Sequence, residues 1–331
     1  MQAAETLEPL RERLAAQLTW LVSCQIRCPG DDADGALALA PGSNRVNPYF
    51  ANFAALALLE DQAAFPAVER YLEWYLRHLK EDGTIPDYHY PPGSPPRPAR
   101  PDSEDAYAGT YLLLVTQYHR RSGRTEWVRE NLPALKKVAR VIVGLKDGDG
   151  LTFALADYRV KYLMDNCEAY RGLADFAELL CFLGDPEAAY FRARATEIAR
   201  GVEKGLWDRR RRCYRPRKAA WFAARANLRR FYPDAAAQLY PALYGLIAAS
   251  SPRAAHLYAL FNRHHPGWVD LAPPAYPWML LAYCACLHGD YARARKKLGR
   301  AWEAYVVPRA PSWYCAEAAF FVLTAARLLR A

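Results

Sequence analysis

The sequence has no apolar run that approaches the roughly 20 residues a membrane-spanning helix needs. The most apolar stretch, residues 51–59, is much too short. Residues 1–14 alternate charged residues with alanine and leucine, and they lack the apolar segment of a secretory signal peptide. We therefore expect no membrane as a partner, and we expect the protein in the cytoplasm.

Motifs of several common chemistries are also missing. No Gly-rich phosphate loop and no Gly-x-Ser-x-Gly nucleophile motif occurs. Cys24 and Cys28 are four residues apart, but no second Cys or His pair is placed to complete a zinc site. We expect the eight cysteines to be reduced thiols that act as small apolar side chains. Neither a metal nor another cofactor is expected.

The composition permits a large core and a basic surface. The chain has 331 residues, of which 52% are hydrophobic, and a net charge of +9 with a pI of about 9.1. Such a charge is compatible with an anionic partner, although an arginine-rich composition alone produces the same value. We expect an oligo- or polysaccharide partner, which the charge allows to be anionic, and we expect no nucleic acid.

Apolar residues recur at helical spacing in about twelve segments joined in pairs by short links. The segments are 7–24, 50–60, 65–79, 106–118, 127–145, 170–183, 188–206, 236–247, 253–261, 276–287, 291–305 and 313–329. The first helix of a pair is apolar all round, as in 51–58, and the second is charged on one face, as in 292–297. An inner ring and an outer ring would need this alternation. We predict an all-α fold, an (α/α)6 barrel or toroid of about six helical hairpins, in one domain over residues 1–331.

Three long connections interrupt this pattern. Residues 82–101 indicate an ordered but non-helical loop, and residues 147–164 indicate a short β-hairpin. Residues 207–232 are basic and aromatic, with four successive arginines at 209–212. These four are either a solvated turn or a clamp on an anionic polymer. Long loops in compact domains often form binding edges, so we expect short β-hairpin loops at a cleft.

Carboxylates gather at the predicted helix starts. Asp102, Glu104 and Asp105 precede one apolar helix, and Asp165 and Glu168 precede another. If these starts share a face of a closed ring, their acids converge on a cleft suited to sugar chemistry. The alternative is capping, in which Asp102 caps one helix and Glu168 closes a capping box with Asp165.

Other residues at helix starts and in loops are candidates for holding a sugar. Flat aromatic rings match the C–H face of a pyranose, and a glutamate in an apolar helix needs a partner or a cleft. The candidates are Asn47, Tyr49, Tyr107, Tyr170, Asp234, Tyr276, Trp278, Trp313 and Glu317, with Trp221 and Tyr314 beside them.

At these helix starts the sequence resembles the six-hairpin glycosidase superfamily, over about residues 4–330. Residues 102–108 are similar to the Asp-rich start of an inner helix in glycoside hydrolase family 8, where acidic residues line the sugar site. Residues 47–53 stand where that family carries its acid glutamate, and Asn47 replaces it. An amide cannot donate a catalytic proton as a carboxylic acid does. Either the acid comes from elsewhere, with Asp87 and Glu168 as the best candidates, or catalysis of this type is lost.

The resemblance implies a glycoside hydrolase with two carboxylates beside the scissile bond. We predict Asp105 and Glu168 as the pair, with Asp87 as the substitute acid. In an inverting enzyme the pair would be roughly 6.5–9.5 Å apart. The sugar would be bound by Asp102, Glu104, Tyr107, Asn47, Tyr49, Asp165, Tyr170, Asp234, Tyr276, Trp278, Trp313 and Glu317.

Other functions fit the same pattern. A non-catalytic glycan-binding or scaffold protein would explain Asn47. A sugar epimerase, a polysaccharide lyase and a class II terpene cyclase are further enzymes of this architecture. An open helical solenoid for protein partners is the structural alternative.

Overall fold

The structure is a computed structural model that describes residues 8–219 and 222–331. Leu7, at the start of the first predicted helix, and Trp221 lie outside these residues. Contacts group the chain into two compact units. Unit 1 combines residues 1–78, 86–100 and 267–331, and unit 2 combines residues 79–85 and 101–266. The single domain over residues 1–331 stays a prediction.

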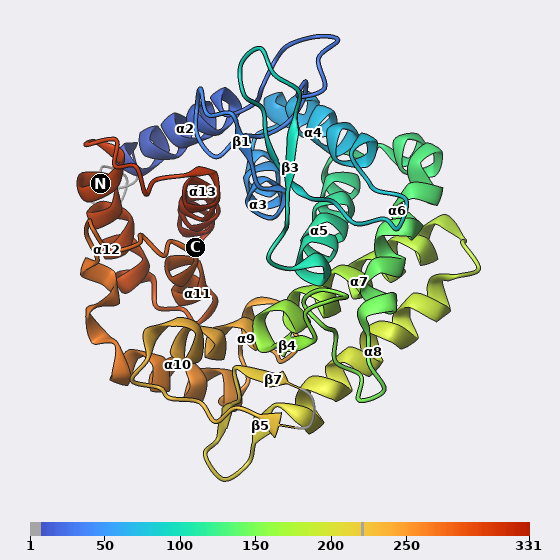
Figure 1. Ribbon diagram of the computed structural model, residues 1–331. Helices are drawn as coiled ribbons and strands as arrows, with labels where there is room; N and C mark the ends of the chain where they lie inside the picture. The colour runs from blue at the N-terminus through green and yellow to red at the C-terminus, as the bar shows by residue number, and fades with distance from the viewer. Residues whose placement is uncertain (1–7, 220–221) are drawn as a thin grey trace. The chain divides into compact units, whose positions relative to one another are not determined.

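Unit 1 consists of helices from both ends of the chain (Figure 1). They are α2 (Glu8–Ser23), α3 (Pro48–Leu58), α4 (Phe65–Arg77), α11 (Leu280–Leu287), α12 (Tyr291–Ala301) and α13 (Cys315–Arg330), with the short turns η1 (Gln62–Ala64) and η5 (Trp302–Val306). Helix α13 is buried along most of its length, because it packs against α2, α3 and α11. Helix α12 is charged on one side, and it buries only the side that includes Ala294 and Leu298.

Unit 2 consists of the middle of the chain. Its helices are α5 (Glu104–Ser122), α6 (Thr125–Leu145), α7 (Leu163–Leu183), α8 (Ala188–Gly205), α9 (Tyr240–Leu243) and α10 (Pro252–His264), with the short turns η2 (Phe231–Ala235) and η3 (Ala236–Leu239). Helix η4 (Pro266–Asp270) follows where the chain leaves this unit. Helix α7 packs against both α5 and α8, as Figure 1 shows. Gly184 ends α7 in the left-handed conformation, at φ 71°, which glycine adopts without strain.

Helices α5 and α7 touch through their backbones at two glycines. A Cβ atom at Gly172 would overlap the carbonyl oxygen of Gly109 and lie 2.6 Å from its Cα. A Cβ atom at Gly109 would lie 2.6 Å from the carbonyl oxygen of Glu168. Only glycine fits at either position, so this contact sets the position of the first turns of α7 against α5.

Three small antiparallel sheets accompany the helices. Unit 1 contains β1 (Arg45–Val46), β2 (Asp87–His89) and β3 (Arg97–Ala99), in that order. Unit 2 contains β4 (Val160–Tyr162), β7 (Arg217–Ala219) and β8 (Phe222–Ala223) in one sheet, and the hairpin β5 (Trp207–Asp208) with β6 (Cys213–Tyr214). Strand β4 leads directly into α7, so the sheet fixes where that helix begins.

The all-α class and the paired helices are confirmed, and the largest differences from the prediction concern four segments. Helix α7 begins at Leu163 rather than at residue 170, so Asp165 and Glu168 are inside the helix and form no capping box. Helix α11 begins at Leu280 rather than at residue 276, because Trp278 has φ 56° and interrupts the helix. Residues 147–164 form isolated bridges, and their strand β4 pairs with β7. The helix expected over 236–247 is divided between η3 and α9. Within the described residues, no helix is long and apolar enough to cross a membrane.

Candidate active site

Four carboxyl groups lie at the first turns of α5 and α7 in unit 2. Ser103, not Asp102, caps α5, and its hydroxyl accepts a hydrogen bond from the backbone N–H of Ala106 at 3.3 Å. Asp105 is fully buried, whereas Asp102 on the other side of the cap is exposed. The Ser103 hydroxyl lies 2.8 Å from Oδ1 of Asp105 and 3.2 Å from Oδ2 of Asp165, so the structure brings the acids of the two helix starts together. The negative charges of Asp102 and Glu168 also act on Asp165.

Asp105 is held by three hydrogen-bond donors. Its Oδ1 accepts from the Ser103 hydroxyl at 2.8 Å and from the backbone N–H of Ala106 at 2.9 Å, and its Oδ2 accepts from the Thr152 hydroxyl at 2.5 Å. Thr152 is in turn positioned by Asn166, which accepts from the Thr152 N–H at 2.8 Å and donates to its carbonyl oxygen at 3.1 Å. Burial raises the pKa of Asp105 to about 6, and these donors oppose the rise.

Asp165, unlike Asp105, has few hydrogen-bond donors and several negative charges near it. Its Oδ2 lies 3.2 Å from the Ser103 hydroxyl, whose only proton is directed to Asp105 at 2.8 Å. Burial raises the pKa of Asp165 well above its ordinary value, and the negative charges of Asp105, Glu168 and Asp102 add to the rise. A protonated Asp165 can donate to the Ser103 oxygen, which satisfies every group in this chain of hydrogen bonds. Three neighbouring negative charges thus favour a proton on Asp165, whereas three donors favour the ionised form of Asp105.

Glu168 lies one helical turn after Asp165. It is 2% exposed, and its Oε1 accepts a hydrogen bond from the hydroxyl of Tyr244 at 2.9 Å. Tyr244 follows α9, 76 residues away in the sequence, and the sequence analysis did not single it out. Partial burial raises the pKa of Tyr232 to about 12, and the negative charges of Asp165, Asp102 and Glu168 add to the rise. Both tyrosines therefore belong to this candidate site.

The other predicted residues of unit 2 have different surroundings. Glu104 is half-buried, and burial raises its pKa. Tyr107 is 1% exposed and lies in the core of the unit. Tyr170 is half-buried. Asp234 is 4% exposed, and its Oδ1 accepts from the backbone N–H of Asn227 at 2.7 Å, so it organises the preceding loop.

Unit 1 brings Asn47 and Asp87 together. Asn47 caps α3 by accepting from the N–H of Phe50 at 2.9 Å, and its amide donates to both carboxylate oxygens of Asp87, at 3.1 and 3.0 Å. Asp87 is half-buried on β2. Donors to both oxygens favour the ionised carboxylate. Asn47, which stands where the catalytic acid was expected, thus holds Asp87, the carboxylate predicted to replace that acid.

Half-buried aromatic rings form a continuous row in unit 1. The ring centroids are 5.6 Å apart from Tyr49 to Phe50, 4.7 Å from Phe50 to Tyr314, 5.5 Å from Tyr314 to Tyr276 and 5.2 Å from Tyr276 to Trp278. Phe50 is the member that the sequence analysis missed. Its signal was its place one residue after Tyr49, at the start of α3. Such a row offers the flat apolar faces on which sugars stack.

Glu317 lies in the first turn of α13 and is 5% exposed. Its Oε2 accepts from the backbone N–H of Met279 at 2.7 Å, and Tyr276 also donates to it. Burial raises its pKa to about 7. Trp313 is 5% exposed and donates to the side chain of Gln17 at 3.0 Å. Trp313 is thus anchored in the core, and Tyr276 connects Glu317 to the row of rings.

Lys297 of α12 is a charged group near Glu317 and has no exposed surface. Within the described residues its Nζ atom has no hydrogen-bond partner. Burial lowers its pKa from 10.5 to about 8, and the charges of Glu317 and Asp270 oppose this shift. The difference corresponds to about 3 kcal/mol between the two protonation states.

We expect Lys297→Met to keep or raise the free energy of unfolding at pH 7, by up to about 3 kcal/mol, because it removes a buried unpaired charge. In the wild type the unfolded chain binds more protons between pH 8 and 10.5, so stability rises with pH there, and the variant loses this rise. Denaturant unfolding at pH 7 and pH 10 measures both effects. Lys296→Met is the control, since Lys296 is exposed and pairs with Asp270 at 2.9 Å. A variant less stable than the wild type at pH 7 would contradict the expectation.

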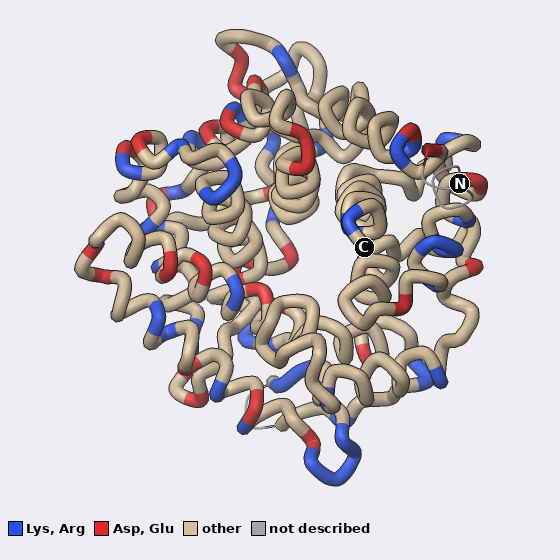
Figure 2. The backbone as a smooth tube through the Cα atoms, turned by 180° about the vertical axis from the view of Figure 1, so that it is seen from behind, with Lys and Arg blue, Asp and Glu red and all other residues tan. Residues whose placement is uncertain are grey.

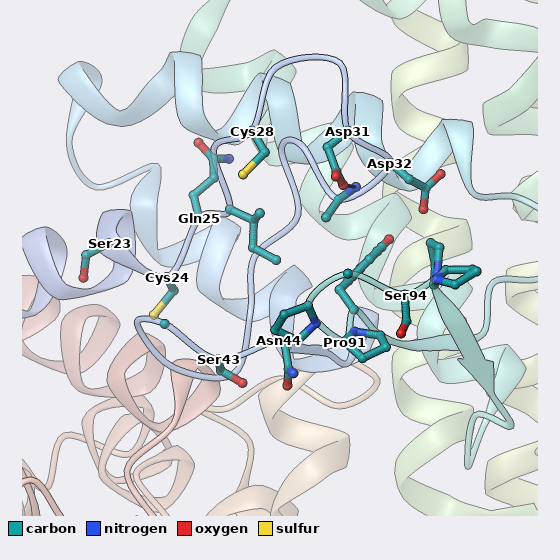
Figure 3. Close-up of a pocket in the computed structure, with 18 residues that line it drawn as sticks. Ser23, Cys24, Gln25, Cys28, Asp31, Asp32, Ser43, Asn44, Pro91 and Ser94 are labelled. Carbon is teal, nitrogen blue, oxygen red and sulfur yellow. Dashed lines mark hydrogen bonds between the residues drawn. The ribbon is translucent and has the colours of Figure 1, made fainter.

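A separate cavity of about 650 Å³ lies in unit 1 between residues 23–44 and 90–96. Figure 3 shows Asp31 and Asp32 on one side, and Ser43, Asn44 and Pro91 on another. None of the predicted site residues lines this cavity. Asp32 is engaged by the ring Nε2 of His78 at 3.0 Å.

The sequence matches no protein family model, and no curated protein is similar to it. Solved structures do match. A glycosidase in a glutamate-to-alanine variant has a TM-score of 0.70 at 13% identity, with 98% of each chain covered. A family GH63 mannosylglycerate hydrolase from Thermus thermophilus, in complex with glucose, has a TM-score of 0.64 at 14% identity, with 98% of this chain and 100% of that chain covered.

A rhamnosidase from Klebsiella oxytoca with bound rhamnose has a TM-score of 0.63 at 14% identity, with 95% of this chain and 64% of that chain covered. The chain has the (α/α)6 fold of the six-hairpin glycosidases. These matches confirm the predicted fold class, and the resemblance to the six-hairpin glycosidases holds at the level of the fold. The likeness to family 8 in particular stays a prediction. These matches concern the fold and assign no role to an individual residue.

Proposed function

We propose that the protein is a glycoside hydrolase that acts on an oligo- or polysaccharide, with Glu168 as its catalytic carboxylate. The observation that carries this proposal is the group of Asp102, Asp105, Asp165 and Glu168 at the first turns of α5 and α7. Crowding carboxyl groups in a buried site is unfavourable for stability, and it is typical of sites that carry out acid–base chemistry. The shared six-hairpin fold and the carbohydrate names of its structural matches support the same class.

The two aspartates have different roles in this proposal. Asp105, with three donors and no exposed surface, is an ionised positioning group for the first turns of α5 and α7. Asp165 carries a proton, which limits the negative charge beside Glu168. Environments that separate the protonation of neighbouring carboxyl groups are the usual basis of glycoside hydrolysis. Asp87, held by the Asn47 amide, is a separate candidate for a reacting carboxylate in unit 1.

The net charge and the cysteines support two further parts of the proposal, the kind of saccharide and the compartment. The net charge of +9 favours an acidic saccharide over a neutral one as the substrate. Six of the eight cysteines are buried among apolar residues, which supports a reducing compartment such as the cytoplasm.

A product-detecting screen against neutral and acidic oligosaccharides tests the function. We expect turnover by the wild type, roughly a thousandfold lower turnover by Glu168→Gln and reduced turnover by Asp105→Asn. An unchanged rate for Glu168→Gln would reject the assignment of this residue. Saturable binding without product, in wild type and variants alike, would favour the non-catalytic glycan-binding protein instead.

A further inference from the structure

The hairpin β5–β6 carries a turn made entirely of arginine, Arg209 to Arg212. All four residues of this turn are exposed. In Figure 2, which views the molecule from behind, the turn is the basic loop at the lower edge. The proposed hydrolase chemistry makes no use of it.

Hydrogen bonds hold the backbone of the turn although it is exposed. Oδ1 of Asp208 accepts from the backbone N–H groups of Arg210 and Arg211, both at 3.1 Å, and the Asp208 carbonyl accepts from the N–H of Arg212 at 2.8 Å. At the base of the hairpin, the fully buried side chain of Gln238 accepts from the N–H of Tyr214 at 2.7 Å and donates to its carbonyl at 2.8 Å. The guanidinium groups thus project from a fixed backbone.

The positive charges of the turn are largely uncompensated. Arg209, Arg210 and Arg212 form no ion pair with any described residue, since the carboxylate of Asp208 is engaged by the turn and by Arg215 at 3.3 Å. Arg212 moreover has φ 53°, a left-handed conformation that glycine or asparagine adopts with less strain. Mutual repulsion and backbone strain are both unfavourable. This concentration of unpaired positive charge makes the turn a candidate for binding an anion.

A second loop extends this surface. The guanidinium of Arg211 donates to the carbonyl of Ala226 at 2.9 Å, which ties the turn to residues 222–230. Arg225 and Arg229 of that loop are exposed. We call the set of Arg209, Arg210, Arg212, Arg225 and Arg229 the basic surface.

The segment that carries the basic surface also reaches the carboxylates. Strand β7 pairs with β4, and Arg217 of β7 donates a hydrogen bond to Tyr162, the residue before α7. At the far end of the segment, Tyr232 is under the electrostatic influence of Asp165 and Glu168. The pairing of β7 with β4 thus connects the segment of the basic surface to the helix that carries Glu168.

We propose that the basic surface binds the carboxylate or sulfate groups of an acidic polysaccharide, and that this polysaccharide is the substrate of the Glu168 site. The inference rests on the proposed function for its second part. A nucleic acid fits less well, because its charges lie on the phosphates that link its units, whereas the charged group of a uronic acid lies at one edge of the sugar ring. A polysaccharide can instead present the C–H face of a sugar ring to Tyr232 and its neighbours.

The test compares four proteins: the wild type, the triple variant Arg209→Gln, Arg210→Gln and Arg212→Gln, a control triple variant Arg129→Gln, Arg192→Gln and Arg200→Gln, and Glu168→Gln. The control removes the same charge from exposed arginines of unit 2 that form no ion pair with a described residue. Calorimetry measures the binding of oligogalacturonate, an alginate fragment and a heparin fragment. Methyl-esterified oligogalacturonate is the neutral counterpart.

We expect the first triple variant to bind at least one acidic fragment about tenfold more weakly and with a shallower salt dependence, because ionic contacts release counterions. The affinity of the first triple variant for the methyl ester should equal that of the wild type. The control triple variant and Glu168→Gln should bind the acidic fragments about as tightly as the wild type does. Equal affinities of the two triple variants for all three acidic fragments would overturn the inference, while loss of turnover in Glu168→Gln would leave the proposed function standing.

Two further results separate the parts of the proposal. If the first triple variant lost binding but Glu168→Gln kept full turnover, the proposed function would fail and the basic surface would remain a binding surface. Single-stranded RNA serves as the competing anion. If RNA bound more tightly than every saccharide, and the first triple variant lost that binding, the assignment to a polysaccharide would be wrong.

Discussion

Gly172→Ala lowers the free energy of unfolding by at least about 3 kcal/mol, or prevents folding, because it forces two packed helices apart. The added methyl carbon would overlap the Gly109 carbonyl oxygen and lie 2.7 Å from its carbonyl carbon. Both neighbours are backbone atoms, which cannot turn aside as a side chain can. The separation would also move the turn of α7 that carries Glu168, so turnover should fall in any protein that still folds.

Gly144→Ala is the matched control for this substitution. Gly144 is in the last turn of α6, and a Cβ atom there would meet no atom within 4 Å. We expect this variant to gain about 0.5–1 kcal/mol, since alanine favours the helix. Denaturant unfolding with circular dichroism measures both variants. Equal stabilities of the two would show that α5 and α7 are not in backbone contact.

Glu168→Gln lowers kcat by roughly a thousandfold, the usual effect of removing a group that transfers a proton in the reaction. Asp165→Asn, only three residues away, should keep kcat within about threefold at neutral pH. An asparagine has the shape of a protonated aspartate and can donate a hydrogen bond to Ser103 in the same way. A loss in Asp165→Asn as large as that in Glu168→Gln would show that Asp165 itself reacts or must ionise.

The free energy of unfolding of Asp165→Asn, measured against pH, tests whether Asp165 binds a proton in the folded protein. The folded-state pKa of Asp165 is raised, so folding binds a proton and the wild type loses stability as the pH rises from about 4 toward that pKa. Asp105, Glu168 and Asp102 act in this direction, whereas the Ser103 hydrogen bond acts against it. Asp165→Asn should therefore show a flatter stability profile above pH 4. An identical slope in both proteins would mean that Asp165 is ionised when folded.

The helical part of this fold was predictable because periodicity is a local property. Apolar spacing gave α4, α6 and α8 nearly to their ends, and Gly184 marked the turn after α7. The start of α7 was misplaced because Asp165 and Asn166 have the composition of a cap. What decides it is β4, whose partner β7 is more than 50 residues further along the chain. Trp278 likewise gave no local sign of its positive φ.

The candidate site was predictable in composition and not in detail. The crowding of acids at 102–105 and 165–168 indicated a site of this kind. The different roles of these acids depend on contacts between residues far apart in the sequence, such as Thr152 with Asp105 and Tyr244 with Glu168. The Gly109–Gly172 contact is equally invisible in the sequence, because a glycine inside a helix shows nothing of its neighbour.

The hydrogen bonds of Gln238 give the β5–β6 hairpin two levels of local stability. The side-chain amide stands where a third strand would pair with Tyr214, and it is closed off from solvent together with η3. The tip depends on Asp208 alone for its backbone donors. Amide protons at the tip can thus exchange with water through a small opening, while those at the base require a larger one. The arginines can adapt to ligands of different spacing without loosening the helices beneath them.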